Sequence, residues 1–269
     1  MAKITVHASY GLDVRELDFS SIYYGYSYTR TNSLFRADYG SGYADEFRGS
    51  GFKYNSYGEP TAGTVTSYAA FAGGTRAFIV DGFSISATSI VKAANTYSTS
   101  DDMSVIASGL KGSDSFTGGN ATDYVKLYAG NDTLLGNGGD DFLFAGSGND
   151  KINGGLGRDR LYGESGADTF IFTSFKHSTA SPTSRDTIYD FTSEDVIHLA
   201  TIDANTKLTG NQAFSFIGTN AFTGKAGQLM YKKMSSDTYI FADLNGDKKA
   251  DFSIHLDDAI TLRAGDFIL

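Results

Sequence analysis

Residues 109–171 divide without a gap into seven units of nine: GLKGSDSFT, GGNATDYVK, LYAGNDTLL, GNGGDDFLF, AGSGNDKIN, GGLGRDRLY and GESGADTFI. The sixth residue of every unit is aspartate: Asp114, Asp123, Asp132, Asp141, Asp150, Asp159 and Asp168. The eighth residue is always apolar, and the fourth is glycine in every unit except the second, which has Ala121. Three positions that stay in phase over seven units set this segment apart from a Gly- and Asp-rich linker.

The three positions predict a mainly β fold built as a right-handed parallel β-roll. The Gly-rich hexapeptide forms a turn, because glycine adopts positive φ at little cost. The next three residues form a very short strand whose middle side chain points inward, which accounts for one large apolar residue per unit. Two units make one coil with two strands and two turns, so residues eighteen apart stack.

This stacking predicts two rows of aspartates. Asp114, Asp132, Asp150 and Asp168 line one edge, and Asp123, Asp141 and Asp159 line the other. Turn carbonyls join them, including those at the fourth positions: Gly130, Gly139, Gly148, Gly157 and Gly166. An all-oxygen cage is typical of a Ca²⁺ site rather than a zinc or copper site. Neighbouring pairs of aspartates predict about five calcium ions, with a weak site at Ala121.

The repeats resemble the RTX (repeats-in-toxin) family. This resemblance implies a calcium-filled β-roll and partnership with a type I secretion machinery, which exports unfolded chains from bacteria. The absence of cysteine agrees with such a route, and residues 1–14 have no apolar core of a signal peptide. We therefore expect a secreted, extracellular protein that folds when it meets calcium. Without calcium, one apolar side chain per nine residues cannot offset roughly 1–2 kcal/mol of backbone entropy per residue.

Residues 172–269 are similar to the segment that follows the repeats in the serralysin-type subfamily. Arg185–Asn205 and the ending Asp266–Leu269 carry this likeness, and the ending resembles an uncleaved secretion signal. Strands are predicted over 212–217, 228–232, 238–242 and 252–256. We expect this third region to close one end of the roll, as solenoids require.

Two further metal sites are weaker candidates. The loop Asp243, Asn245, Asp247 and Asp251 begins like an EF-hand calcium loop, but Ile254 stands where the final Glu belongs, so an Asn-Gly hairpin without metal is favoured. Asp186 aligns loosely with a serralysin-type site that pairs a Glu with an Asp. His177 occupies the position of that Glu, which leaves only Asp186 as a contributor.

Residues 1–108 contain no repeats. Strands are predicted over 3–7, 52–54, 63–69, 76–79 and 83–86, with a turn at Asp81–Gly82. Two helices are predicted after these strands. The first spans Thr88–Tyr97, and the second begins at a cap formed by Ser98–Ser100 and stops at Gly109. We expect the second helix to cap the other end of the roll. The tyrosine-rich stretch around 23–39 either packs on a sheet or presents aromatic faces to carbohydrate.

The composition and motifs exclude several functions. The net charge of −9 disfavours nucleic acid and anionic membranes, and no apolar stretch is long enough to span a bilayer. There is no H-E-x-x-H zinc-protease motif and no G-x-S-x-G elbow. Two hypotheses remain. One is a non-enzymatic calcium-binding protein whose region 1–108 binds a glycan or host surface; the other is an extracellular hydrolase or lyase acting on polysaccharide through Asp38, Asp45, Glu46 and Arg48.

Overall fold

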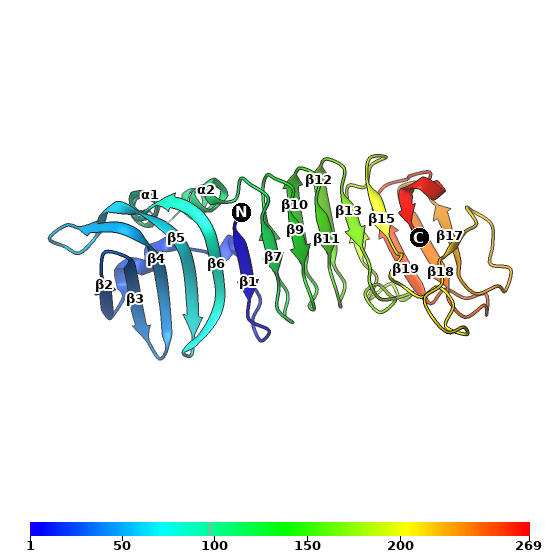
Figure 1. The fold of residues 1–269 in the computed structure, drawn as a ribbon, viewed down its shortest axis with the longest axis horizontal. Coiled ribbons are helices and arrows are strands. Elements are labelled where there is room, and N and C mark those ends of the chain that lie inside the picture. The colour runs from blue at the N-terminus through cyan, green and yellow to red at the C-terminus, as the bar shows by residue number, and fades with distance from the viewer. Residues whose placement is uncertain (97) are drawn as a thin grey trace.

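The computed structural model describes residues 1–96 and 98–269. The molecule is elongated, with a curved antiparallel sheet at one end, the repeats in the middle and a mixed region at the other end (Figure 1). Two sheets run along it, one of twelve strands and one of eight in the described chain. Tyr97, which the sequence placed at the end of the first helix, lies outside the described residues.

The repeats form the predicted parallel β-roll. One sheet contains β7 (Ser115–Thr117), β9 (Thr133–Leu135), β11 (Lys151–Asn153) and β13 (Thr169–Ile171). The other contains β8 (Tyr124–Lys126), β10 (Phe142–Ser147) and β12 (Arg160–Ser165). Neighbouring strands of the roll pair in parallel. Phe116 pairs with Leu134, and Val125 pairs with Leu143, which confirms that residues eighteen apart stack on one another.

The apolar residue of each unit forms the core of the roll. All seven are at most 1% exposed: Phe116, Val125, Leu134, Leu143, Ile152, Leu161 and Phe170. Their neighbours on the same strands are only partly buried or exposed, because alternate side chains leave the roll. On the outer face, aromatic residues stack along the coils, and the rings of Phe144 and Tyr162 lie 4.2 Å apart.

An N-terminal strand extends the roll by one coil. β1 (Lys3–Val6) pairs in parallel with β7 on one side and antiparallel with β6 (Thr75–Ser86) on the other. On the opposite edge, Asp13 forms a bridge with Tyr124. β1 therefore joins the roll to the antiparallel sheet in one continuous sheet.

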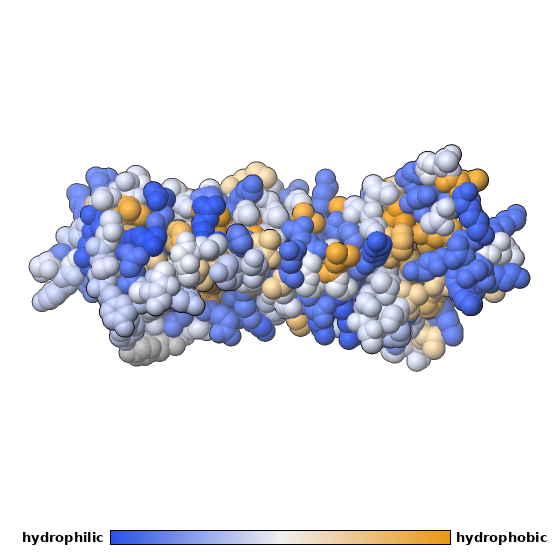
Figure 2. All heavy atoms as spheres, turned by 90° about the horizontal axis from the view of Figure 1, so that it is seen from below, coloured by the Kyte–Doolittle hydropathy of each residue, from blue (hydrophilic) through white to orange (hydrophobic). Residues whose placement is uncertain are grey.

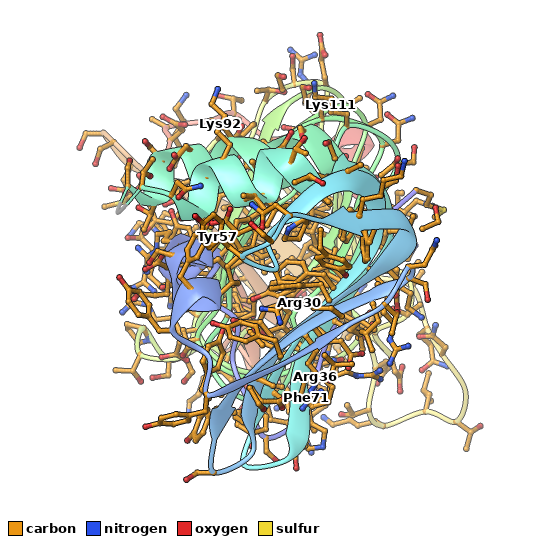
Figure 3. The ribbon with its side chains drawn as sticks, turned by 90° about the vertical axis from the view of Figure 1, so that its left-hand side faces the viewer. Arg30, Arg36, Tyr57, Phe71, Lys92 and Lys111 are labelled. Atoms are coloured by element: carbon orange, nitrogen blue, oxygen red, sulfur yellow. The ribbon has the colours of Figure 1, made fainter. Side chains whose placement is uncertain are left out.

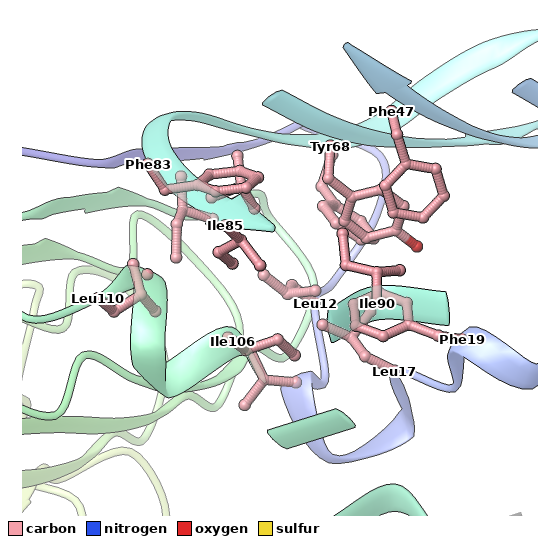
Figure 4. A pocket seen from close by; sticks show the side chains of 15 residues that line it. Leu12, Leu17, Phe19, Phe47, Tyr68, Phe83, Ile85, Ile90, Ile106 and Leu110 are labelled. Atoms are coloured by element: carbon pink, nitrogen blue, oxygen red, sulfur yellow. The ribbon is translucent and has the colours of Figure 1, made fainter. Parts of the chain in front are cut away.

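The antiparallel sheet has a conventional aromatic core. Its strands are β2 (Ser27–Arg30), β3 (Leu34–Gly40), β4 (Tyr43–Tyr54), β5 (Pro60–Ala72) and β6. The helical segments η1 (Val14–Glu16), η2 (Phe19–Tyr24), α1 (Ala87–Ala94) and α2 (Thr99–Gly109) cover its concave face. Phe47 stacks on Tyr68 at 4.7 Å, and Phe19 meets both rings edge-on. A cavity of about 40 Å³ remains between these layers (Figure 4).

Three predictions for this region need correction. Most strands are longer than expected, and β2 and β3 lie largely in the tyrosine-rich stretch around 23–39, for which packing on a sheet was one of the two interpretations. No turn interrupts 81–82: β6 continues through it with a register shift, and Gly82 has a φ of 80°. Ser98 does cap α2 by accepting the N–H of Ser100. However, α2 packs on β6, η1 and α1, and β1 takes the place on the first coil that we expected this helix to fill.

The C-terminal region continues both sheets. It contains β14 (Thr187–Ile188), β15 (Val196–His198), β16 (Ser215–Phe216), β17 (Gln228–Lys233), β18 (Thr238–Asp243), β19 (Phe252–Leu256), η3 (Ala264–Asp266) and β20 (Phe267–Ile268). β14 follows β12 and pairs with β19, while β15 follows β13 and pairs with β20. The strands predicted around 228, 238 and 252 are confirmed, and the one over 212–217 is only two residues long.

The outer surface is mostly hydrophilic, with hydrophobic atoms gathered toward the C-terminal region in the view of Figure 2. Among the described residues, no helix has the length and apolar character needed to cross a membrane.

Candidate calcium sites

The seven repeat aspartates lie inside the edges of the roll. Each is at most 2% exposed, although each carries a carboxyl group. The structure brings them together in the two predicted rows, because hydrogen bonds link aspartates that are eighteen residues apart. Burying a carboxylate without a cation or several donors is costly. Each row therefore needs a partner for its charge.

One oxygen of each carboxyl group is used by the main chain. The N–H of Asp114 donates to Oδ1 of Asp132 at 2.6 Å, and the N–H of Asp132 donates to Oδ1 of Asp150 at 2.6 Å. The other edge repeats this pattern from Asp123 to Asp141 at 2.8 Å. These bonds fix the rotation of every carboxyl group, so that its second oxygen is aimed in the same direction along the row.

The second oxygen has no hydrogen-bond partner in most of these carboxyl groups. This holds for buried Oδ2 atoms on both rows: Asp114, Asp132, Asp141, Asp150, Asp159 and Asp186. Orphaned, buried carboxylate oxygens of this kind are what a hard cation binds. The donor set contains only oxygen, with no thiol in the chain, so the residues fit calcium and do not fit a soft metal.

Burial raises the pKa of these carboxyl groups, and neighbouring carboxylates add to the effect in several of them. The pKa of Asp141 rises to about 8, those of Asp132 and Asp159 to about 7, and those of Asp123 and Asp168 to about 6. A metal-free row at neutral pH is therefore partly protonated. Calcium must displace these protons, so its binding is linked to pH.

The fourth-position glycines are required by the turn. Five of them have φ between 116° and 137°: Gly130, Gly139, Gly148, Gly157 and Gly166. A Cβ on Gly148 would collide with the carbonyl oxygen of Gly130, and one on Gly166 with that of Gly148. The carbonyl oxygen of one turn thus lies directly against the fourth-position glycine of the next coil, where no side chain fits. These are the five glycines that the sequence singled out.

The first turn of each row differs. Gly112 and Ala121 are not among the described residues with positive φ, so alanine is tolerated in the second unit. The Oδ2 of Asp123 accepts the N–H of Gly119 at 3.1 Å and is therefore not orphaned. The carbonyl groups of Gly112 and Ala121 nevertheless lie against Gly130 and Gly139 of the next coil, as in the later turns. A weak site at Ala121 therefore stays a prediction.

Asp186 joins the second row. The N–H of Asp159 donates to its Oδ1 at 2.9 Å, its Oδ2 is orphaned, and it is fully buried. Burial, and then the charge of Asp159, raise its pKa well above the usual range. His177, which stands where the resemblance leads one to expect a Glu, is half-buried, and burial lowers its pKa. The hydroxyl of the neighbouring Ser178 accepts the N–H of Asp186 at 2.8 Å.

Sequence reasoning missed Asp195, which ends the first row. It accepts the N–H of Asp168 at 2.8 Å, and its Oδ2 accepts the N–H of Thr192 at 2.7 Å. The signal was present: Asp186–Ile188 and Asp195–Ile197 repeat the spacing of Asp and apolar residue in the nonapeptides and keep their phase of nine. The unit at 172–180, which has His177 in place of the aspartate, hid it.

The loop at 243–251 is a tight hairpin between β18 and β19. Asp243 is buried and accepts the N–H groups of Asn245, Gly246 and Lys248. Asp251 accepts the N–H of Leu244 and the side-chain amide of Asn245, whereas Asp247 accepts the N–H of Lys249. These internal bonds hold the loop between the two strands. Whether it also binds a metal stays a prediction.

Three of the four candidate catalytic residues of the enzyme hypothesis lie in one ion-pair cluster, and Asp45 lies on the other face of the sheet. Ala37 pairs with Asp45 and Arg36 with Glu46, so Asp45 and Glu46 point to opposite faces of the sheet. Asp45 is buried and accepts hydrogen bonds from Tyr39 at 2.6 Å and Tyr68 at 2.8 Å. The remaining residues, Asp38, Glu46 and Arg48, form ion pairs around Arg36, whose guanidinium lies 4.6 Å from the ring of Phe71 (Figure 3).

Comparison with known proteins bears on the repeats. The family model described as RTX calcium-binding nonapeptide repeat (4 copies) matches residues 106–134 and 135–170. Two solution structures from the Azotobacter vinelandii mannuronan C5-epimerase are similar. The AlgE6R3 subunit is 28% identical with a TM-score of 0.31, covering 60% of this chain and 80% of its own. The AlgE6R2 subunit is 25% identical with a TM-score of 0.32, covering 59% and 88%.

No match was found among curated proteins. The assignment of the repeats to a family therefore depends on three observations: seven in-phase units, two rows of buried aspartates and the matching family model. Residues 106–170 are RTX calcium-binding nonapeptide repeats, and repeats of this family bind calcium.

Proposed function

We propose that this chain is a secreted, extracellular protein whose roll folds when calcium fills the two rows of aspartates. The observation that carries the proposal is the set of buried Oδ2 atoms without a partner on both edges. Calcium would be held by these oxygens and by the turn carbonyls around Gly130, Gly139, Gly148, Gly157 and Gly166. When bound, it supplies the positive charge that the buried carboxylates lack.

The residues of the chain explain why folding should depend on the ion. In the metal-free roll, successive carboxylates repel one another: burial raises the pKa of Asp132 most, and the charges of Asp150 and Asp114 raise it further. The core contributes one large side chain per unit, and each ordered residue costs roughly 1–2 kcal/mol of backbone entropy. The free energy of calcium binding then becomes free energy of folding.

Secretion by a type I machinery is part of the same proposal. Its support is the combination of RTX repeats with a chain that contains no cysteine, since a chain without disulfides can be exported unfolded. Calcium is scarce in the cytosol and abundant outside, so the repeats would fold after export.

For the N-terminal region we propose non-enzymatic binding of a glycan or cell surface. A cleft of about 220 Å³ lies between η2, β2 and α1, and its lining includes Tyr23, Tyr28, Arg30, Tyr57 and Glu59. Tyr57 is 85% exposed, and Figure 3 shows it beside Arg30 at this end of the molecule. Exposed aromatic rings next to charged hydrogen-bonding groups suit a sugar, which offers both an apolar face and hydroxyls. In the hydrolase or lyase alternative, Asp38, Glu46 and Arg48 are engaged in ion pairs with one another or with Arg36, and Asp45 is buried on the opposite face.

The calcium proposal is tested by far-UV circular dichroism during a calcium titration, with magnesium as the control. We expect a cooperative gain of β signal with calcium and none with magnesium. Calorimetry should count about five ions for the repeat pairs, and two more if Asp186 and Asp195 extend the rows. A spectrum that is already complete in chelator and does not change with calcium would refute calcium-dependent folding.

The glycan proposal needs a separate test. A glycan array with the calcium-loaded protein would be compared with the Tyr57→Ala variant, which removes the exposed ring of the cleft. Tyr26→Ala is the matched control, because Tyr26 is 86% exposed and does not line the cleft. Binding that is lost in Tyr57→Ala and kept in Tyr26→Ala supports the cleft. The absence of any bound glycan, or equal binding by both variants, contradicts it.

A further inference from the structure

A second kind of metal site lies outside the roll, at the end of the hairpin formed by β18 and β19. Asp237 precedes β18, His255 lies on β19 and Asp257 follows β19. The three side chains place one ligand atom each within 4.8 Å of one another, and they are the one His/Asp/Glu group of this kind in the described part of the chain. From this geometry we infer that Asp237, His255 and Asp257 bind a divalent transition-metal ion, of which zinc is the test case.

The strand register builds this cluster. Tyr239 pairs with His255 and Thr238 with Leu256, so Asp237 and Asp257 occupy the next opposed positions. Residues two apart on a strand share a face. His255 and Asp257 use their N–H groups in the same way, donating to the carbonyl groups of Asp186 and Ile188, each at 3.0 Å. The sheet therefore fixes three ligand side chains on one face.

The imidazole is held in the orientation that a metal ligand needs. Nδ1 of His255 lies 3.1 Å from the hydroxyl of Thr187 on the adjacent strand β14, and Nε2 faces Oδ1 of Asp237 at 3.0 Å. Metal-binding histidines generally engage their second nitrogen in this way. The imidazole also stacks on the ring of Tyr239, with 4.8 Å between the ring centroids. The guanidinium of Arg185 lies 5.2 Å from the centroid of the same Tyr239 ring. Thr187, outside the cluster, is thus an independent sign of a positioned ligand.

The donor set selects the type of ion. One imidazole nitrogen with two carboxylates suits zinc and related ions, whereas calcium prefers six to eight oxygens. Ligand atoms around a tetrahedral zinc lie about 3.3 Å apart, given bonds of about 2.0 Å, so small side-chain rotations would close the site. Asp257 is exposed and His255 is 17% exposed, which leaves room for water as a further ligand.

The cluster is separate from the calcium rows, so the test uses the calcium-loaded, full-length protein. Zinc chloride is titrated calorimetrically in excess calcium, and binding is followed by NMR of the four histidine imidazoles. We expect one zinc ion per chain and a shift of the His255 resonances, which His255→Gln identifies. The variants Asp237→Asn and His255→Gln should each weaken zinc binding at least tenfold.

Two matched controls distinguish this site from adventitious binding. Asp258→Asn removes an exposed charge next to Asp257, and His7→Gln removes an exposed histidine far from the cluster. Both should bind zinc like the parent chain. Circular dichroism with calcium verifies that each variant is folded, and Asp257→Asn provides a milder change at the exposed ligand. Absence of zinc binding, or equal binding in the parent and the cluster variants, would overturn the inference.

Discussion

The roll and the antiparallel sheet share one continuous sheet but are stabilised in different ways. In the antiparallel sheet, strands of up to thirteen residues bury clustered aromatic rings such as Phe19, Phe47 and Tyr68. In the roll, strands of three to six residues bury one apolar side chain per unit together with a carboxyl group. We therefore expect the first region to be stable without metal. In the second, buried carboxyl groups recur in every unit, and we expect a bound cation to balance their charge.

Removing calcium should produce the largest difference in stability between the two regions. We expect backbone amides of residues 109–171 to exchange as in an unfolded chain when a chelator is added, while the strands β4 to β6 stay protected. Hydrogen exchange followed by mass spectrometry, resolved by peptide, makes this measurement. Protection that falls equally in both regions would show that they fold as one unit, and unchanged protection in the roll would rule out the calcium requirement.

Core truncations should show the two modes of stabilisation separately. Phe47→Ala is expected to destabilise the antiparallel sheet by about 3–5 kcal/mol, with or without calcium. Leu143→Ala should cost about 2–5 kcal/mol in the roll, and this loss should appear as a higher calcium concentration at the folding midpoint. Denaturant unfolding in calcium and in chelator measures both. A Leu143→Ala chain with an unchanged calcium midpoint would contradict the coupling.

A single added methyl group should damage one turn of the roll. Gly148→Ala places a Cβ against the carbonyl of Gly130 at a φ of 137°, and such strain costs on the order of 1–3 kcal/mol. Gly265→Ala is the control, because nothing lies within 4 Å of the added atom and no positive φ is required there. Thermal unfolding in calcium should separate the two variants, and equal melting temperatures would refute the role of Gly148.

Neutralising one carboxylate should weaken calcium binding without affecting the other region. Asp141→Asn is expected to lower affinity about tenfold, or about 1.4 kcal/mol, at the sites next to it. Asp258→Asn makes the same change on an exposed side chain outside the roll and should leave the affinity nearly unchanged. Calorimetric titration compares the two, and similar losses would indicate a general effect of net charge.

The smallest expected effect is on pH dependence. The pKa values of the row carboxyls are raised in the folded, metal-free roll, with Asp141 at about 8 and Asp168 at about 6. Protonated carboxyls therefore favour the metal-free fold, whose stability should fall as the pH rises from about 4 to 8. A roll that is already folded when calcium binds should release protons near pH 7 and few above pH 9, whereas a chain that folds on binding starts with ionised carboxyls and should release few at either pH. Titration calorimetry in buffers of different ionisation enthalpy measures this release.

The sequence predicted the roll in detail because each position of a unit has one physical task. The nine-residue repeat alone identified the inward-pointing residues, the turn glycines and both rows of aspartates. Asp195 escaped because the unit at 172–180 has His177 in place of the aspartate, so that partners in each row lie twenty-seven residues apart there instead of eighteen. The cluster at Asp237, His255 and Asp257 escaped because strand pairing, which no local motif reveals, brings it together. The tyrosine-rich stretch around 23–39 left sheet packing and carbohydrate binding open, because its sequence does not define the limits of β2 and β3.

The position of β1 has a consequence for how the chain reaches its final state. This strand fits between β6 and β7, and Lys3 pairs with Ser115, more than a hundred residues away. Closing so long a loop is entropically costly and slow, so we expect β1 to dock after the elements on both sides have formed. Until then β7 presents an open strand edge, which can recruit a strand from another molecule. An N-terminal fusion that delays β1 should therefore favour aggregation during refolding.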